Sequence, residues 1–213
     1  MAKKLSKKAK KRLKAAVESV ENRSAAEIVV SLRPRSGSYA APGLALGLFA
    51  PLIGLVYMLY SDTVFELWAI LANTVVLEVV GALLGLTVLK IWPGVLGAGR
   101  LEDRVEEAAM AQFYRLGVSR TRDRSGILVY ISSHERVCRV LPDVGVEAAL
   151  ERDTWLKAIA PIQRAGSLPP KSPRRNEELA KAIQALGPLL EKALPRREDD
   201  INELADIAEE ETS

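Results

Sequence analysis

The stretch AAPGLALGLFAPLIGLVYMLY, Ala40–Tyr60, decides the fold, because its 21 residues carry no charge. A helix needs about 20 apolar residues to cross the hydrocarbon core of a bilayer. A helix of a soluble protein normally has a polar face, and this stretch offers none. Pro51 lies in the interior of the stretch, where proline kinks a helix. We therefore predict a transmembrane helix, kinked at Pro51 unless neighbouring groups satisfy the freed carbonyl.

A second apolar stretch begins after only two residues and is interrupted by Glu66, Asn73 and Glu78. Aromatic residues cluster near the connecting turn, and amphipathic side chains settle at the level of the lipid headgroups. The two stretches together predict a transmembrane helical hairpin, with spans at about 40–60 and 64–90. The lipid bilayer is thus the first predicted partner.

The charges that flank the hairpin predict its orientation. Residues 1–39 hold eleven Lys and Arg against three acidic residues, and Arg100 and Arg104 follow the second span, whereas the turn carries only Asp62. Cytoplasmic flanks of membrane proteins are enriched in Lys and Arg. We therefore expect a multi-pass protein of the cell inner membrane, with two spans and both termini in the cytoplasm. The lone Cys138 agrees with a reducing compartment.

The composition excludes several classes of protein. A single Cys and a single His cannot form a disulfide framework, a structural zinc site or a Cys–His pair with a third orienting residue. With 213 residues, the chain is long enough for one core of ordinary size together with the hairpin. It is too short for a large multidomain enzyme.

The N-terminal segment is strongly basic. Apolar side chains recur at helical spacing over residues 4–21, and eight Lys and Arg occupy other positions between residues 3 and 14. This pattern predicts a basic amphipathic helix, which either covers a sheet with a solvated face or also contacts anionic lipid headgroups through residues 3–14. Nucleic acid is a weaker partner, because no aromatic residue is interleaved with the lysines to stack on bases.

The rest of the chain has the pattern of a small α/β domain. A nearly continuous apolar run is typical of a strand buried on both faces, and a short turn joins it to the next strand as an antiparallel hairpin. The final stretch holds eight acidic residues between 198 and 211 and no basic one, so we expect a poorly ordered tail. The predicted strands are 27–33, 126–132 and 136–141, and the predicted helices are 101–116, 152–165 and 176–194.

The order of these elements predicts an α/β domain that the transmembrane hairpin interrupts after the first strand. The predicted division is residues 1–39 for the basic helix and first strand, 40–92 for the hairpin, 93–197 for the remainder of the α/β domain and 198–213 for the acidic tail.

Several soluble segments share a pattern with a known family. They are residues 24–30, 117–132, 135–136, 143, 145, the helix around Trp155 and residues 202–204. In these segments the chain resembles the TPM domain family, named from thylakoid lumen, photosystem repair and acetylcholine-receptor modulator proteins. The resemblance is to its bacterial membrane-inserted branch, and it is most specific over residues 120–132. It implies a small α/β/α sandwich.

The resemblance also implies a range of functions. Some members of the family are weak phosphatases or divalent-cation binders, and others serve the maintenance of membrane complexes or modulate receptors. This chain departs from the enzymatic branch at residues 141–145, where LPDVG replaces a Gly-rich segment, and at the Pro-rich residues 167–173. We therefore expect a non-enzymatic binding or maintenance module for a membrane partner. The alternative is a membrane-tethered, divalent-cation-dependent phosphatase.

Three carboxylates form a candidate metal site. Asp123 precedes the central strand and Asp143 follows its antiparallel partner, so both should lie at the same end of the sheet. Glu27 joins them if the first strand runs parallel to the second. Such a group could bind a hard cation such as Ca²⁺ or Mg²⁺, which takes oxygen ligands.

Arginines next to Asp123 leave two other interpretations open. Arg120, Arg122 and Arg124 could neutralise Asp123 in a salt-bridged loop that orders the strand entry. The same arginines could instead bind an anion or a phosphate.

Glu78 and Asn73 are anomalous inside an apolar stretch. A carboxylate at the centre of a span costs about 2.5 to 3.5 kcal/mol on insertion scales, which marks it as a candidate functional or assembly position. Two spans cannot enclose a water-filled path, so the candidate role is intramembrane assembly, in a homodimer or with a partner's helix, with Asn73 donating to the same partner. The alternative is a Glu78 that is tolerated in a tilted, overlong helix.

Overall fold

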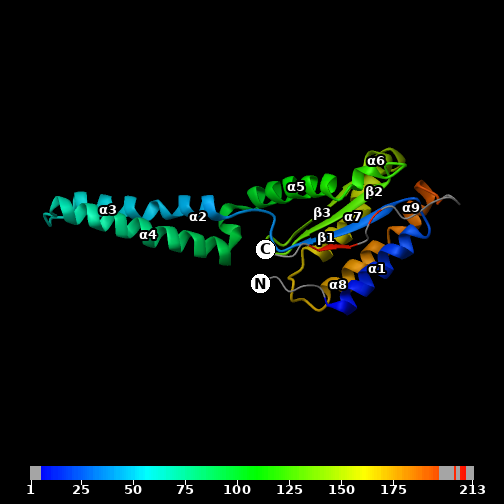
Figure 1. Cartoon of the computed structure of the whole chain (residues 1–213), viewed down its shortest axis with the longest axis horizontal. Helices are drawn as coiled ribbons and strands as arrows, with labels where there is room; N and C mark the ends of the chain where they lie inside the picture. Colours follow the sequence, from blue (N-terminus) through cyan, green and yellow to red (C-terminus); the bar gives the residue numbers. More distant parts are fainter. Residues whose placement is uncertain (1–5, 197–203, 205–206, 210–213) are drawn as a thin grey trace. The chain divides into compact units, whose positions relative to one another are not determined.

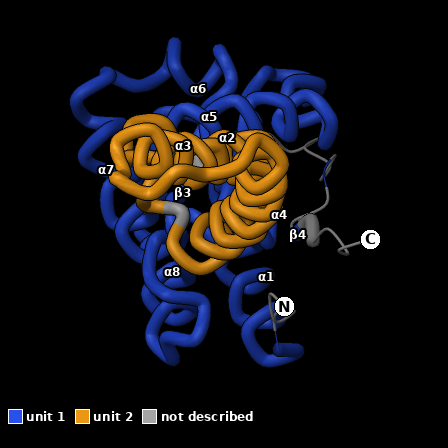
Figure 2. Tube along the Cα trace, turned by 90° about the vertical axis from the view of Figure 1, so that its left-hand side faces the viewer, with its two compact units in different colours: residues 1–36, 102–213 blue, residues 37–101 orange. Residues whose placement is uncertain are grey.

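The computed structural model describes residues 6–196, 204 and 207–209. Contacts divide the chain into two compact units, one of residues 1–36 and 102–213 and one of residues 37–101 (Figure 2). The second unit is therefore an insertion into the first. Residues 3–5, at the start of the predicted basic helix, lie outside the described residues.

The first unit contains a four-stranded sheet in the order β3-β2-β1-β4. β1 pairs in parallel with β2, in a register that places Glu27 opposite Gly126, and β2 pairs antiparallel with β3. β2 is buried along its whole length, as its apolar sequence predicts. The strands are β1 (Glu27–Arg33), β2 (Gly126–Ser132), β3 (Val137–Pro142) and β4 (Ile207–Glu209).

Helices cover both faces of this sheet. The face that carries Ile28, Val30 and Ile127 packs against α1, α7, α8 and α9, and the face that carries Val29 and Leu128 packs against α5 (Figure 1). The predicted α/β domain is confirmed, with a layer of helices on each side. The helices are α1 (Lys7–Glu21), α5 (Ala98–Arg115), α6 (Val144–Ala149), α7 (Arg152–Gly166), α8 (Arg175–Gln184) and α9 (Gly187–Ala193), with 3₁₀ turns η1 (Pro93–Leu96) and η2 (Val118–Arg120).

Three elements of this unit differ from prediction. The single helix predicted at 176–194 is two helices, because Pro188 lacks the N–H that would continue α8 and instead begins α9. The short helix α6 was not predicted; Asp143 caps its first turn. Part of the acidic tail is ordered, since β4 pairs with Val30–Leu32 of β1.

The second unit is a helical hairpin. Its first arm is α2 (Ala40–Gly47) and α3 (Phe49–Tyr60), and its second arm is α4 (Leu67–Ile91). The interruption at Leu48 has a local cause: Pro51 has no N–H to donate to the carbonyl of Gly47. The kink predicted from Pro51 is therefore observed as a break between two helices.

Glycines allow the two arms to pack closely. A Cβ on Gly81 would lie 2.3 Å from the Gly47 carbonyl oxygen, and one on Gly85 would lie 2.0 Å from that of Gly43. Two small-xxx-small pairs therefore face each other, and only glycine permits this backbone approach. The released carbonyl of Gly47 consequently points at the backbone of α4.

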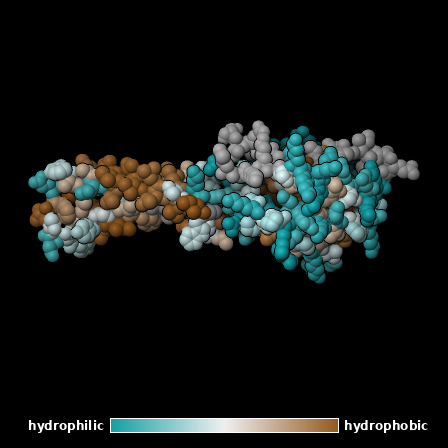
Figure 3. Space-filling view, turned by 90° about the horizontal axis from the view of Figure 1, so that it is seen from below, coloured by the Kyte–Doolittle hydropathy of each residue, from teal (hydrophilic) through white to brown (hydrophobic). Residues whose placement is uncertain are grey.

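Most of the hairpin surface is exposed and apolar (Figure 3). Two segments are long and apolar enough to cross a membrane, Ala40–Tyr60 and Leu67–Ile91, and only 18% and 11% of their most apolar windows are buried. Core helices of soluble proteins that pass the same length and composition test are mostly buried.

We predict that Gly81→Ala disrupts the hairpin. The added methyl would overlap the backbone of Gly47, and overpacking of this kind costs about 1 to 3 kcal/mol. Thermal unfolding of the full chain in detergent, followed by circular dichroism, should show that the variant loses its helical signal at a lower temperature than the wild type. Gly99→Ala is the matched control, because nothing lies within 4 Å of its added Cβ. Equal melting of both variants would contradict the tight packing of the arms.

Candidate functional site

The candidate carboxylates lie around the start of β2. β1 pairs in parallel with β2, which was the condition for Glu27 to join the two aspartates, and the register places Glu27 beside Gly126. The Asp143 N–H donates to the Gly126 carbonyl at 2.8 Å, so β3 ends at the same edge. The end of the sheet is therefore as the sequence predicts, and the side chains decide what it can bind.

Asp143 is held by Arg124 in a bidentate pair. Arg124 Nε donates to Asp143 Oδ2 at 2.6 Å and Nη2 donates to Oδ1 at 2.8 Å. The same Oδ1 accepts the Val144 N–H at 2.8 Å, which caps α6. Arg124 adopts a positive φ of 53°, an uncommon conformation for a side chain of this size, and its carbonyl accepts the Gly145 N–H. The pair thus joins the loop before β2 to the start of α6.

The environment of Asp143 lowers the pKa of its carboxyl group. Burial by itself raises the pKa of Asp143, but the hydrogen bonds from Arg124 and the Val144 N–H, together with the charge of Arg124, lower the pKa below its ordinary value. Because the folded state lowers this pKa, the stabilisation is fully present above the ordinary value of about 4 and is lost as the pH falls through the folded value.

The expected metal triad is not assembled. Within residues 6–196, 204 and 207–209, no group of three His, Cys, Asp or Glu side chains is placed to hold a metal ion. The physical reason is that the Asp143 carboxylate already binds a guanidinium and a helix N-terminus. Glu27, Asp123 and Asp143 therefore share an end of the sheet, and the Asp143 carboxylate is occupied by Arg124 and the Val144 N–H.

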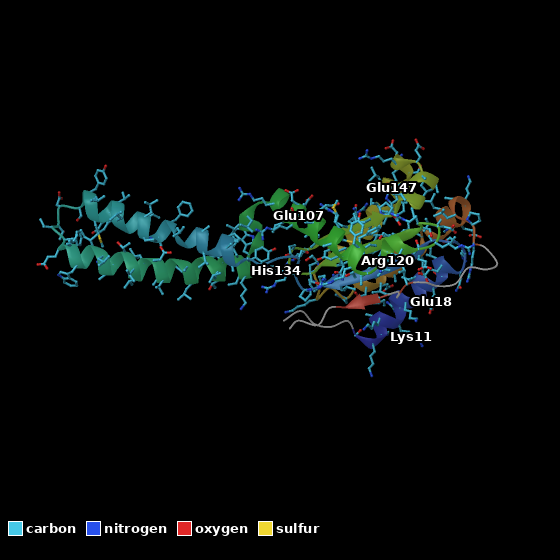
Figure 4. All side chains as sticks on the ribbon, turned by 45° about the horizontal axis from the view of Figure 1, so that its top comes forward. Lys11, Glu18, Glu107, Arg120, His134 and Glu147 are labelled. Carbon is cyan, nitrogen blue, oxygen red and sulfur yellow. The ribbon has the colours of Figure 1, made fainter. Side chains whose placement is uncertain are left out.

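The three arginines have different environments. Arg124 is committed to Asp143, whereas Arg120 is exposed at the end of η2 (Figure 4). Arg122 and Asp123 each have interactions of their own. The observed arrangement is closest to the salt-bridged loop, with Asp143 in place of Asp123 as the carboxylate that Arg124 binds.

We predict that Asp143→Asn lowers stability and removes part of its dependence on acid. Asn can still cap α6, so the variant removes mainly the charge pair, and losing charged hydrogen bonds to a buried group costs about 1 to 3 kcal/mol. Chemical denaturation of the full chain in detergent between pH 3 and 7 measures this, with the acid destabilisation shallower in the variant. Asp153→Asn is the control, since Asp153 is exposed on α7. An unchanged acid profile for Asp143→Asn would contradict the assignment.

A second polar cluster lies at the opposite end of β2, where the chain leaves for the hairpin. The buried Glu135 accepts the Ser36 N–H at 3.1 Å on Oε1 and the Ser132 hydroxyl on Oε2. The Ser36 hydroxyl lies 3.0 Å from the Tyr130 phenol oxygen. Ser36 is the last residue of the first unit before the insertion. Glu135 and Tyr130 therefore fix the segment from which the hairpin departs.

Burial dominates the electrostatics of this cluster. It raises the pKa of the Tyr130 phenol, and the Ser36 hydrogen bond and the Arg33 charge offset this only in part. It also lowers the pKa of Arg33, whose guanidinium donates to Gln112 of α5 at 2.8 Å. The neutral phenol is thus favoured in the folded state. The folded chain therefore loses stability relative to the unfolded chain as the pH rises above the ordinary tyrosine pKa of about 10.

Sequence reasoning missed this cluster. Glu135 follows a strand in a tight turn, where a charged residue is usually solvated, and the cluster depends on Ser36, which lies 99 residues away. A pattern signal existed: Tyr130 and Ser132 are polar side chains inside an otherwise apolar central strand, and buried polar groups require partners.

We predict that Glu135→Ala loosens the exit to the hairpin. The Ser36 N–H and Ser132 hydroxyl would lose their acceptor, which costs about 1 to 3 kcal/mol. Hydrogen exchange of the full chain in detergent should show faster exchange at residues 34–37. Glu191→Ala, an exposed site on α9, should leave this segment protected. If both variants exchange alike, Glu135 does not hold the segment.

Cys138 is a buried core residue of β3. Burial raises the pKa of its thiol to about 12, so the reactive thiolate is disfavoured. Gly166 packs closely on its sulfur.

Arg175 is also buried, and its Nε and Nη2 atoms have no hydrogen-bond partner among the described residues. Neither atom is accessible to solvent.

The basic helix α1 packs with its apolar side on the domain core. Ala9, Leu13, Ala16, Val17 and Val20 are buried. The opposite side carries exposed cations, and Lys11 projects from it away from the sheet (Figure 4). Two further cations form ion pairs, Arg12 with Glu177 and Lys14 with Glu18. The predicted amphipathic helix is confirmed, and its exposed cations are Lys7, Lys8, Lys10, Lys11, Arg12 and Lys14.

Glu78 and Asn73 lie on different sides of α4. Glu78 is half-buried on the side that packs against the first arm, near Gly81, whereas Asn73 is exposed. Five residues of α-helix turn through about 140°, which separates the two side chains. Helical geometry therefore gives the two side chains different neighbours, and their role in intramembrane assembly stays a prediction.

Comparison with known proteins finds a solved structure with a similar fold. No protein-family model matches the chain, and no curated protein matches it. Among solved structures, the chain is similar to the NMR structure of the BA42 protein from the psychrophilic bacterium Bizionia argentinensis. The two share 17% sequence identity with a TM-score of 0.58, over 99% of this chain and 98% of that chain. At this identity the similarity concerns the fold alone.

Proposed function

We propose that the protein is a membrane-anchored α/β domain of the cell inner membrane, TPM-like in its soluble part, that binds or maintains a membrane partner. The observation that carries the proposal is the exposed apolar hairpin, two helices of spanning length inserted into a domain with its own polar surface. In water this surface would be a large apolar patch, whereas in lipid it is in its preferred environment.

The charge distribution supports a topology with both termini in the cytoplasm. The hairpin turn carries Asp62 and the flanks carry arginines, as the positive-inside rule requires. The exposed lysines of α1 then face the same compartment as the anionic inner leaflet. Each Lys or Arg near such a surface contributes about 1 kcal/mol of attraction, so α1 is the proposed contact with anionic lipid headgroups.

The polar clusters support a binding role over a catalytic one. Asp143 and Glu135, the buried acids with resolved partners at the two ends of β2, accept structural hydrogen bonds from Arg124, Val144 and Ser36. A general acid, a general base or a metal ligand needs a carboxylate that is available to substrate or metal. The partner is proposed to be another membrane protein or a second copy of the chain.

We predict that the hairpin turn lies on the outer side of the inner membrane and that α1 lies on the cytoplasmic side. A membrane-impermeant maleimide added to bacterial spheroplasts should label a Ser61→Cys variant and not a Lys11→Cys variant, and both should react after permeabilisation. The wild-type chain is the background control, because its buried Cys138 should react with neither treatment.

Two outcomes would contradict this topology. Labelling of Lys11→Cys in intact spheroplasts would invert the orientation. Recovery of the full chain from the aqueous fraction of lysed cells, monodisperse without detergent, would exclude the membrane anchor itself.

A further inference from the structure

We infer that the exposed side of α4 around Asn73 is the surface on which a second copy of this chain docks in the membrane. The inference rests on the proposed function, because it requires the hairpin to lie in lipid. It names a second copy of the chain as the partner. The group that recognises this partner is the side-chain amide of Asn73.

The Asn73 amide is placed where lipid cannot satisfy it. The side chain is exposed on α4 and makes no hydrogen bond to another described residue. It lies six residues into the helix, roughly 9 Å from the Leu67 end at 1.5 Å per residue, which is inside the hydrocarbon region of a span of this length. An amide in hydrocarbon gains free energy by pairing with another helix.

The neighbours of Asn73 form a packing stripe that the hairpin does not use. Residues at alternating spacings of four and three lie along one side of the helix, the pattern of a left-handed helix pair. All but Ala69 are exposed, and the glycines that contact the first arm lie on another side. The stripe consists of Ala69, Asn73, Val76, Val80, Leu83 and Thr87.

Thr87 is a second polar residue on this stripe, two heptads from Asn73. Its hydroxyl donates to the Leu83 carbonyl of its own helix at 2.7 Å, so in a symmetric pair Thr87 contributes as a small side chain that permits close packing. Polar side chains of a span that share one side favour helix contact on that side. Glu78 lies outside the stripe, on the side toward the first arm.

The self-complementary amide of Asn73 points to a second copy as the occupant. Copies inserted with the same orientation can form a closed pair only about an axis along the bilayer normal, so each residue meets its own counterpart at the same depth. An amide is complementary to itself, because it carries both a donor and an acceptor. Two Asn73 side chains can therefore satisfy each other, whereas two apposed Glu78 carboxylates would repel when charged.

The test measures self-association of the full chain in liposomes. Donor- and acceptor-labelled copies, labelled through Ser61→Cys, are mixed over a series of protein-to-lipid ratios, and energy transfer gives the dimerisation constant. Asn73→Leu should weaken dimerisation by about 3- to 30-fold, the equivalent of one interhelical hydrogen bond. Asn73→Gln should retain most of it. Leu71→Ala, on the opposite side of α4, is the control and should leave it unchanged.

Several results would overturn the inference. They are a wild-type chain that stays monomeric at every ratio, an Asn73→Leu variant that dimerises like the wild type, or a dimer lost in Glu78→Leu and kept in Asn73→Leu. A membrane protein that co-purifies with the wild type and is lost in Asn73→Leu, without any change in self-association, would assign the stripe to a different partner. Each of these leaves the anchor intact, whereas absence of the chain from the membrane fraction would reject the proposed function itself.

Discussion

The parallel pairing of β1 with β2 is the constraint on which the rest of the structure depends. Adjacent parallel strands need a crossover connection, because the chain must return from the end of one strand to the start of the next. Here the crossover contains α5 and the whole 65-residue insertion, residues 37–101. The two ends of an insertion at this position must lie close together, so that the chain can continue into α5. A helical hairpin satisfies this requirement, because its two ends lie side by side.

The two polar clusters then have complementary structural roles. Arg124 and Asp143 fix the loop that leads into β2, and Glu135 fixes the segment that leaves β1. Both carboxylates are buried and accept hydrogen bonds on both oxygens, the arrangement in which polar groups specify a unique geometry. The two carboxylates therefore fix the segments of the first unit that adjoin the two ends of β2.

Sequence patterns predicted the elements well where periodicity was long, and less well where a single residue decided. The hairpin, the three main strands and the antiparallel pairing follow from apolar runs and turn lengths. The break before α9, the short helix α6 and the ordered strand β4 do not, because each depends on one proline, one capping Asp or a partner strand far away in sequence. The metal triad failed for the same reason, since proximity in the sheet does not determine which acceptor a guanidinium binds.

The sequence by itself determined that this chain has two segments suited to lipid and one α/β domain, because hydrophobicity and charge are properties of the residues alone. Only the tertiary structure decided which side of α4 packs against its own hairpin and which side is exposed. The glycines at 43, 47, 81 and 85 draw the backbones of the two arms together, and that contact turns Glu78 inward and Asn73 outward.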